Sequence, residues 1–387
     1  MPQMSHSDPI KVGLLYSDTG VSGAIEASQR LATLFAIEEI NQGGGINGRE
    51  IVPVSYDPQS DPVRYRALAE HLIAVDNVKV LFGCYLSSAR KAVIPVVERW
   101  NRLLFYATLY EGFEFSSNLI YTGAAPNQNH VQLADFMMSN FGARVYLVGS
   151  SYIYPYESNR IMQDLVAQRA DGAILGQRYV PLGPGPGDFS DIIFDIKQQQ
   201  PDFIFSTVVG SATADFYRAY FEAGLDPASM PIASLTTCEV EVAQMGAEVA
   251  LGHFTSAPYF QSIESAANHA CLARFRARYG VHVQPNASWE AAYFQVHLFA
   301  NAMRSCGSDD IDALLPALLG AEFDALQGKV RIDAANHHTC LYPRIGRVNA
   351  SGQFTIVREA LRAVSPDPYL VAHSLGNWSR SPSTQEA

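Results

Sequence analysis

The sequence lacks long apolar runs and clusters of basic side chains. No ten consecutive residues are all apolar, whereas a membrane-spanning helix needs roughly 18 or more. Lys and Arg together number 27 against 38 Asp and Glu, which gives a net charge of −11, and no basic cluster stands out against this background. We therefore expect a chain that does not cross a membrane and does not bind nucleic acid directly.

Metal, redox and nucleotide motifs are also missing. The chain has five widely spaced cysteines without a CxxC pair, and its histidines show no HExxH spacing. The glycine-rich segment at residues 43–48 follows a predicted helix, whereas a phosphate-binding loop precedes one. We expect these glycines to end that helix, and the sequence predicts no metal and no cofactor.

No export signal is visible at the start of the chain. Such a signal has a basic beginning and an apolar segment of about 7 to 15 residues, but the first basic residue is Lys11 and residues 12–16 already resemble a core strand. This pattern indicates a cytoplasmic protein or a chain from which a signal has been removed. Because an odd number of scattered cysteines favours the reducing cytoplasm, a cytoplasmic location is our expectation.

What the sequence does contain is a strand followed by a helix, several times over. With 387 residues, 48% of them apolar, the chain is long enough for about two domains of ~150 residues. The alternation in its first hundred residues is typical of a parallel sheet with helices on both faces. The predicted strands are 11–17, 51–56 and 78–82, and the predicted helices are 29–42, 63–75 and 89–100.

A second series of the same kind follows. It has predicted strands at 144–149, 173–180, 202–207 and 231–234, with helices at 155–170, 189–199 and 213–223 between them. We therefore expect an α/β protein with two similar Rossmann-like lobes, each with a central parallel sheet.

The last third of the chain is too short for a third lobe. Its helices and short strands are expected to complete the two lobes, so that the chain crosses between them more than once and forms a hinge. The expected division is an N-terminal lobe of residues 10–122 plus 258–328, a C-terminal lobe of residues 123–257 plus 329–380, and flexible termini at 1–9 and 381–387.

The turns that follow the predicted strands mark the expected ligand site, because ligands of open α/β sheets bind beyond the carboxyl ends of the strands. These turns are rich in Ser, Thr and Tyr and contain no Arg, Lys, Asp or His, so a small, polar, uncharged guest is favoured. A serine at a helix start suits a carbonyl oxygen, and tyrosine hydroxyls can accept from an NH2 group, which together suit an amide. The turns are 83–88, 106–110, 150–154 and 235–237.

The same residues also have a purely structural interpretation. Ser87 and Ser88 could serve as helix N-caps, and Tyr106 and Tyr110 could be core aromatics. Catalysis has less support, since Cys84 has no histidine or acid close in sequence and is better explained as a buried thiol. We expect a protein that is not an enzyme.

Longer segments resemble a known family. Residues 83–99 (GCYLSSARKAVIPVVER), 110–118 (YEGFEFSSN) and 121–129 (YTGAAPNQN) are similar to the short-chain amide and urea binding branch of the type I periplasmic binding proteins. Within that branch the chain resembles the AmiC-type amide sensors most, and the likeness extends over residues 10–379. The segments that carry this second likeness are 151–155, 205–210, 232–237 and 367–378.

This resemblance implies a cytoplasmic negative regulator of an aliphatic amidase operon. A protein of this type binds a small aliphatic amide such as acetamide and thereby releases an AmiR-type transcription antiterminator, which itself contacts RNA. The alternative is a solute-binding receptor of an ABC transporter for urea or short-chain amides. The preferred amide does not follow from the sequence, and a homo-oligomer remains open. The resemblance places the ligand on Tyr85, Ser87, Tyr106, Thr108, Tyr152 and, more loosely, Thr236.

Overall fold

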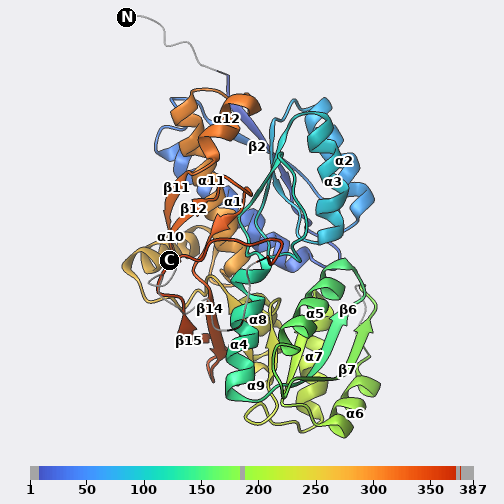
Figure 1. Ribbon diagram of the computed structural model, residues 1–387. Helices are drawn as coiled ribbons and strands as arrows, with labels where there is room; N and C mark the ends of the chain where they lie inside the picture. The colour runs from blue at the N-terminus through green and yellow to red at the C-terminus, as the bar shows by residue number, and fades with distance from the viewer. Residues whose placement is uncertain (1–7, 184–187, 372–374, 376–387) are drawn as a thin grey trace, which may run out of the picture.

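The computed structural model describes residues 8–183, 188–371 and 375. The termini expected to be flexible therefore lie outside the described residues, apart from residues 8 and 9. The first lobe, at the top of Figure 1, is built on a parallel sheet with the strand order β2-β1-β3-β4-β5. Its strands are β1 (Ile10–Leu15), β2 (Ile51–Tyr56), β3 (Val80–Gly83), β4 (Leu103–Tyr106) and β5 (Leu119–Tyr121).

Helices cover both faces of this sheet. Neighbouring residues of a strand point to opposite faces, so Leu14 packs with Phe35 in one apolar cluster and Leu15 packs with Leu72 in another. The first cluster belongs to α1 (Gly23–Gln42), α10 (Ala266–Tyr279), α11 (Ala287–Cys306) and α12 (Ile311–Leu318), and the second to α2 (Pro62–Ala74) and α3 (Ser87–Arg99).

The glycines after α1 end that helix, as the sequence predicts. Gly45 has a φ of 73°, and a Cβ there would lie 2.1 Å from the carbonyl oxygen of Arg49. Only glycine fits such a turn.

The second lobe contains a sheet of seven strands in the order β15-β14-β10-β9-β8-β6-β7. The strands from β10 to β7 are parallel, and β14 and β15 add antiparallel pairs at one edge. The strands are β6 (Arg144–Ser150), β7 (Ala173–Val180), β8 (Phe203–Thr207), β9 (Ile232–Ser234), β10 (Phe254–Ala257), β14 (Arg344–Val348) and β15 (Phe354–Glu359).

Two groups of helices pack on this sheet. The first group buries Met137 and Leu165, and the second buries Ile196 and Phe216. The first group is α4 (His130–Asn140), preceded by the short η1 (Pro126–Gln128), and α5 (Ile153–Val166); the second is α6 (Ser190–Gln199), α7 (Ser211–Glu222), α8 (Glu239–Met245) and α9 (Ala247–Ala250).

A small third sheet bears on the division into lobes. Its strands are β11 (Glu322–Ala325), β12 (Gly328–Ile332) and β13 (Thr339–Cys340). Val330 and Ile332 belong to the apolar cluster of α1 and α11, so β12 packs with the first lobe, whereas the expected boundary at 328/329 gives it to the second. We propose that the last crossing lies nearer to residue 342.

With this division, we propose that the chain passes between the lobes at residues 122–129, 258–265 and 341–343. Figure 1 shows the orange helices of the chain's last third beside the blue first lobe, and the red strands β14 and β15 in the lower lobe. The predicted fold class is confirmed: two α/β lobes with parallel sheets are joined by a hinge of several crossings.

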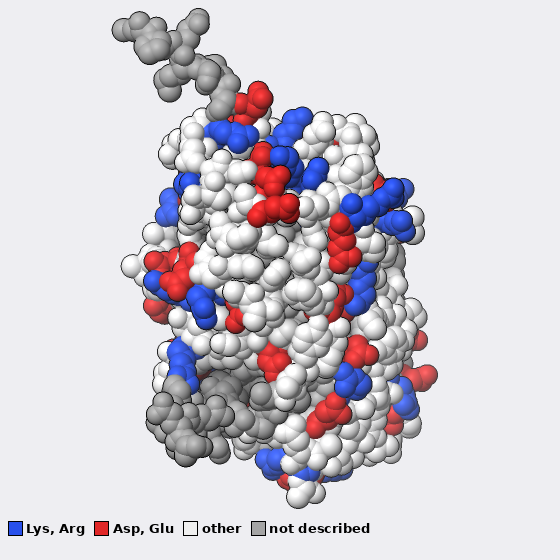
Figure 2. All heavy atoms as spheres, turned by 45° about the horizontal axis from the view of Figure 1, so that its top comes forward, with Lys and Arg blue, Asp and Glu red and all other residues white. Residues whose placement is uncertain are grey.

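The surface carries charges of both signs. On the face shown in Figure 2, blue and red side chains lie beside one another, as in the ion pair of Lys79 with Asp309 at 2.8 Å. Among the residues that the structure describes, no helix combines the length and the apolar character needed to cross a bilayer.

Candidate functional site

A small cavity of about 220 Å³ lies between the lobes, beyond the carboxyl ends of strands from both sheets. Five of the six predicted ligand-binding residues line it, and no charged residue is among the described residues of its wall. The lining residues are Tyr85, Ser87, Thr108 and Leu109 from the first lobe and Tyr152, Tyr154, Val209 and Thr236 from the second.

Tyr106 is the predicted residue that the structure does not bring to this wall. Its side chain is buried behind the cavity, and its hydroxyl donates to the backbone carbonyl of Tyr85 over 2.7 Å. Tyr106 therefore supports the turn that carries Tyr85.

Ser87 stands in the first turn of α3, but it is not the N-cap. Leu86 occupies that position, and the Ser87 hydroxyl instead donates to Glu111 Oε2 over 2.6 Å. Arg90 Nη1 lies 3.3 Å from the same hydroxyl oxygen and donates to it. A hydroxyl has one hydrogen and two lone pairs, so one lone pair of Ser87 remains for a guest.

A buried ion cluster lies behind Ser87. The Arg90 side chain is fully buried and reaches Glu111 at 3.0 Å and Glu114 at 2.7 Å, while Lys91 reaches Glu114 at 2.7 Å. Burial opposes the charge of Arg90, but Glu111, Tyr106 and Glu114 together outweigh this effect and hold the pKa of Arg90 well above its ordinary value. Two positive and two negative side chains therefore balance behind an uncharged wall.

The rings of Tyr106 and Tyr110 cover the guanidinium of Arg90, whose Cζ lies 4.7 and 4.8 Å from their centroids. Sequence reasoning missed this cluster because it examined only the turns. Arg90 lies just beyond one turn, on the first helix turn with Ser87, and Glu111 directly follows another.

The threonines of the wall are held by neighbouring groups. Gln29 Nε2 donates to Thr108 Oγ1 over 3.1 Å, and Thr236 Oγ1 donates to the carbonyl of Val208 over 2.9 Å. Gly123 lets a crossing segment pass the backbone of Thr108, since a Cβ there would lie 2.1 Å from the Thr108 carbonyl.

Tyrosines form much of the remaining wall. Tyr152 is the N-cap residue of α5 and makes no side-chain capping bond. Burial raises the pKa of Tyr85 and of Tyr152 well above the ordinary value, so both phenols stay protonated and can either donate or accept. Tyr154 also lines the cavity, and its place two residues after Tyr152 in the same turn is the signal that pointed to it.

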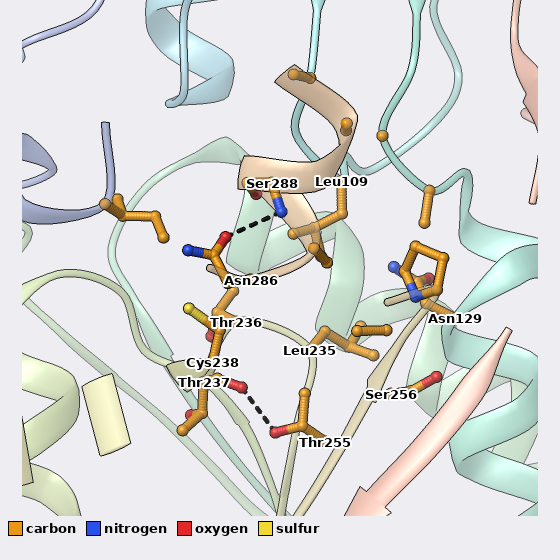
Figure 3. Close-up of a pocket in the computed structure, with 18 of the residues that line it drawn as sticks. Leu109, Asn129, Leu235, Thr236, Thr237, Cys238, Thr255, Ser256, Asn286 and Ser288 are labelled. Atoms are coloured by element: carbon orange, nitrogen blue, oxygen red, sulfur yellow. Dashed lines mark hydrogen bonds between the residues drawn. The ribbon is translucent and has the colours of Figure 1, made fainter. Parts of the chain in front are cut away.

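A larger cavity of about 520 Å³ lies at the hinge and is drawn in Figure 3; we call it the hinge cavity. It is lined by two crossing segments, residues 122–124 and 257–258, and by the start of α11. Asn286 Oδ1 caps that helix by accepting from the Ser288 N–H over 3.0 Å, the upper dashed line of Figure 3.

The two lobes are in contact at the mouth of the cleft. A Cβ on Gly210 of the second lobe would lie 2.6 Å from the carbonyl oxygen of Val21 in the first. The two lobes therefore touch one another next to Val209, which lines the small cavity.

The described residues hold no cluster of three or more His, Cys, Asp or Glu side chains arranged for a metal ion. Cys84 is fully buried, and burial raises the pKa of its thiol well above the ordinary value, so it does not supply a thiolate nucleophile. The wall can hold a small polar molecule by hydrogen bonds from both lobes.

Several sequence relatives that match most of the chain are named as binding proteins. The chain is 24% identical over 342 residues to the Leu/Ile/Val-binding protein homolog 6 of Brucella melitensis, covering 86% of each chain. It is also 24% identical over 334 residues to the leucine-, isoleucine-, valine-, threonine-, and alanine-binding protein of Pseudomonas aeruginosa, covering 84% of this chain and 86% of that one.

Solved structures share the fold. A solute binding protein of an ABC transporter from Rhodopseudomonas palustris, in complex with p-hydroxybenzoic acid, superposes with a TM-score of 0.84 at 23% identity, covering 95% of this chain and 100% of that one. LivJ of Streptococcus pneumoniae, in complex with isoleucine, gives a TM-score of 0.80 at 20% identity and covers 92% and 100% of the two chains.

These findings correct part of the sequence interpretation. The expected cytoplasmic location is wrong, because the matching family consists of periplasmic binding proteins, and nothing in the comparisons supports an amidase regulator specifically. Like these relatives, the chain is a ligand-binding protein and not an enzyme. The model of the family described as periplasmic binding protein domain matches residues 10–375, and the chain therefore belongs to that family of type I periplasmic binding proteins.

Proposed function

We propose that the protein is the solute-binding receptor of an ABC transporter and that its solute is a small uncharged molecule with an NH2 group on a carbonyl, such as a short aliphatic amide or urea. The observation that carries the proposal is the hydrogen bond from Ser87 to Glu111. Because the only hydrogen of Ser87 is directed at Glu111, the hydroxyl can offer the guest only a lone pair, which requires an N–H or O–H donor on the guest.

The carbonyl of an amide also finds partners. The first N–H groups of α3 have no intrahelical acceptor, and the protonated phenols of Tyr85 and Tyr152 can donate. The space inside the cavity, open solvent included, amounts to only about 220 Å³, which favours a small guest.

Charged guests fit less well. The p-hydroxybenzoic acid and isoleucine of the related structures carry a carboxyl group, and none of the described wall residues here could pair with a carboxylate. Behind Ser87 the Glu111 carboxylate and the Arg90 guanidinium offset one another, so this cluster offers an anion no net attraction. Burial of an unpaired charge costs several kcal/mol or more.

From the resemblance to AmiC-type sensors we retain the ligand class and not the compartment. An AmiR-type partner is left out of the proposal, because the partner of a transport receptor is the membrane part of its transporter. The relatives that are named as ABC transporter solute-binding proteins support this assignment.

The test is calorimetry with acetamide, propionamide and urea against acetate, isoleucine and p-hydroxybenzoate. We expect the uncharged compounds to bind and to raise the melting temperature by mass action. The Ser87→Ala variant should weaken amide binding by about 1–3 kcal/mol, the scale for a buried polar group without its partner. Binding of the carboxylates without binding of any amide or urea would overturn the proposal.

A further inference from the structure

The hinge cavity has no role in the function proposed above. The space inside it, open solvent included, amounts to about 520 Å³, against about 220 Å³ for the small cavity. It shares Tyr85, Leu109 and Thr236 with the small cavity. Residues that line two cavities lie between them, so these three residues form a partition.

Of the three residues of the partition, Leu109 is the one whose side chain can be shortened without leaving a buried polar group unpaired. Thr236 is fixed by its hydrogen bond to the Val208 carbonyl, and Tyr85 packs in the apolar cluster of α2 and α3. Leu109 is only partly buried and touches apolar clusters of both lobes. In Figure 3, Leu109 lies in the upper part of the hinge cavity and Leu235 in the lower part.

The hinge cavity is suited to a mainly apolar substituent. Alanines from both lobes line it, including Ala124, Ala257 and Ala291. Two buried polar atoms on its wall, Asn129 Nδ2 and Ser256 Oγ, have no hydrogen-bond partner among the described residues. These two atoms add polar groups to a mostly apolar wall.

We propose that the hinge cavity is a second compartment of the ligand site and that Leu109 determines how far the substituent of a carboxamide extends into it. This inference rests on the proposed function, since the NH2 group stays at Ser87. The native guest is then an amide with a short aliphatic chain, and the space behind Leu109 accepts a longer chain only when this side chain is cut back.

The experiment is calorimetry of acetamide, butyramide and hexanamide with the native protein, Leu109→Ala and Leu34→Ala. Leu34 is a matched control, because it is also partly buried against the α1 cluster and lines neither cavity. Each methylene that becomes buried improves affinity about fourfold. We expect Leu109→Ala to bind hexanamide at least tenfold more tightly than the native protein does, and Leu34→Ala to bind it as the native protein does.

A second variant tests the direction in which the chain extends. Ala291 lines the hinge cavity from α11, so Ala291→Leu in the Leu109→Ala background should remove the gain for hexanamide. An unchanged order of affinities in Leu109→Ala, or a gain that Ala291→Leu leaves intact, overturns the inference. Absence of amide binding to the native protein is a different result and overturns the proposed function instead.

Discussion

Ser87 and Glu111 are joined by a hydrogen bond of 2.6 Å in which the serine is the donor. The carboxylate thus determines that the serine hydroxyl presents a lone pair, and not its hydrogen, to a guest. The other oxygen of Glu111 accepts from Arg90 over 3.0 Å, so the orientation of the carboxylate is fixed from both sides.

Replacement of Glu111 by glutamine should change Ser87 from a hydrogen-bond acceptor for the guest into a hydrogen-bond donor. The amide oxygen of the new side chain will face Arg90, its NH2 group will donate to Ser87, and the serine hydrogen will turn into the pocket. We expect amide affinity to fall about tenfold or more, on the scale of about 1–3 kcal/mol for an unsatisfied buried group. Glu114→Gln is the control, because Glu114 contacts Arg90 and not Ser87. Equal losses in the two variants, measured by calorimetry, would contradict the prediction.

Gly210→Ala should hinder closure of the lobes. The new methyl group would meet the Val21 carbonyl at 2.6 Å, and φ at this position is 70°, which alone costs about 1–2 kcal/mol for a residue with a Cβ. Gly224→Ala separates the two effects, since φ is 68° there and nothing lies within 4 Å of the added carbon. Denaturation should show similar stability losses in both variants, while amide affinity should fall tenfold or more in Gly210→Ala alone.

Arg90→Met should destabilise the fold strongly. Removal of the guanidinium leaves Glu111 without its closest cationic partner and Glu114 with Lys91 alone, and loss of one member of a buried ion pair costs about 3–5 kcal/mol. Lys91→Met is the comparison, because this side chain is 41% exposed and exposed pairs contribute about 0–1 kcal/mol. Urea denaturation of the two variants measures the difference, and similar losses would contradict this account of the cluster.

Glu239 should make stability depend on pH. Burial raises the pKa of this carboxyl to about 8, and its Oε2 has no hydrogen-bond partner among the described residues. The unfolded chain loses this proton near pH 4.3, so between about pH 5 and 8 the folded state holds more protons and stability falls as pH rises. The limiting slope for one group is about 1.4 kcal/mol per pH unit. Glu239→Gln should flatten this part of the stability curve, and a curve parallel to that of the native protein would contradict the assignment.

Much of the fold could be predicted from the sequence, because alternating strands and helices leave few topologies open. The helix expected at 63–75 is observed at Pro62–Ala74, with Asp61 accepting from the Val63 N–H as its N-cap. The helix expected from residue 29 begins already at Gly23, since buried contacts outweigh the low helix propensity of its first residues. The lobe with which β12 packs could not be predicted, because it depends on packing between segments that are distant in the sequence.

The candidate site could be predicted in part for a similar reason. Turns at the carboxyl ends of parallel strands converge, and this brings Tyr85, Thr108 and Tyr152 together. The direction of the Ser87 hydrogen could not be predicted, because it depends on a carboxylate 24 residues away. The cellular compartment could not be predicted either. The fold requires neither paired cysteines nor a particular sequence in its first residues, so these features do not report the location.

The close passage of Gly123 past Thr108 links recognition to motion. Gly123 belongs to a segment that passes between the lobes, and Thr108 lines the small cavity that we propose as the ligand site. Opening of the hinge therefore pulls on the binding surface itself, and release of the cargo is coupled to the same movement that exposes it. A substitution of Thr108 that changes which ligand is bound would then also change how easily the two lobes open.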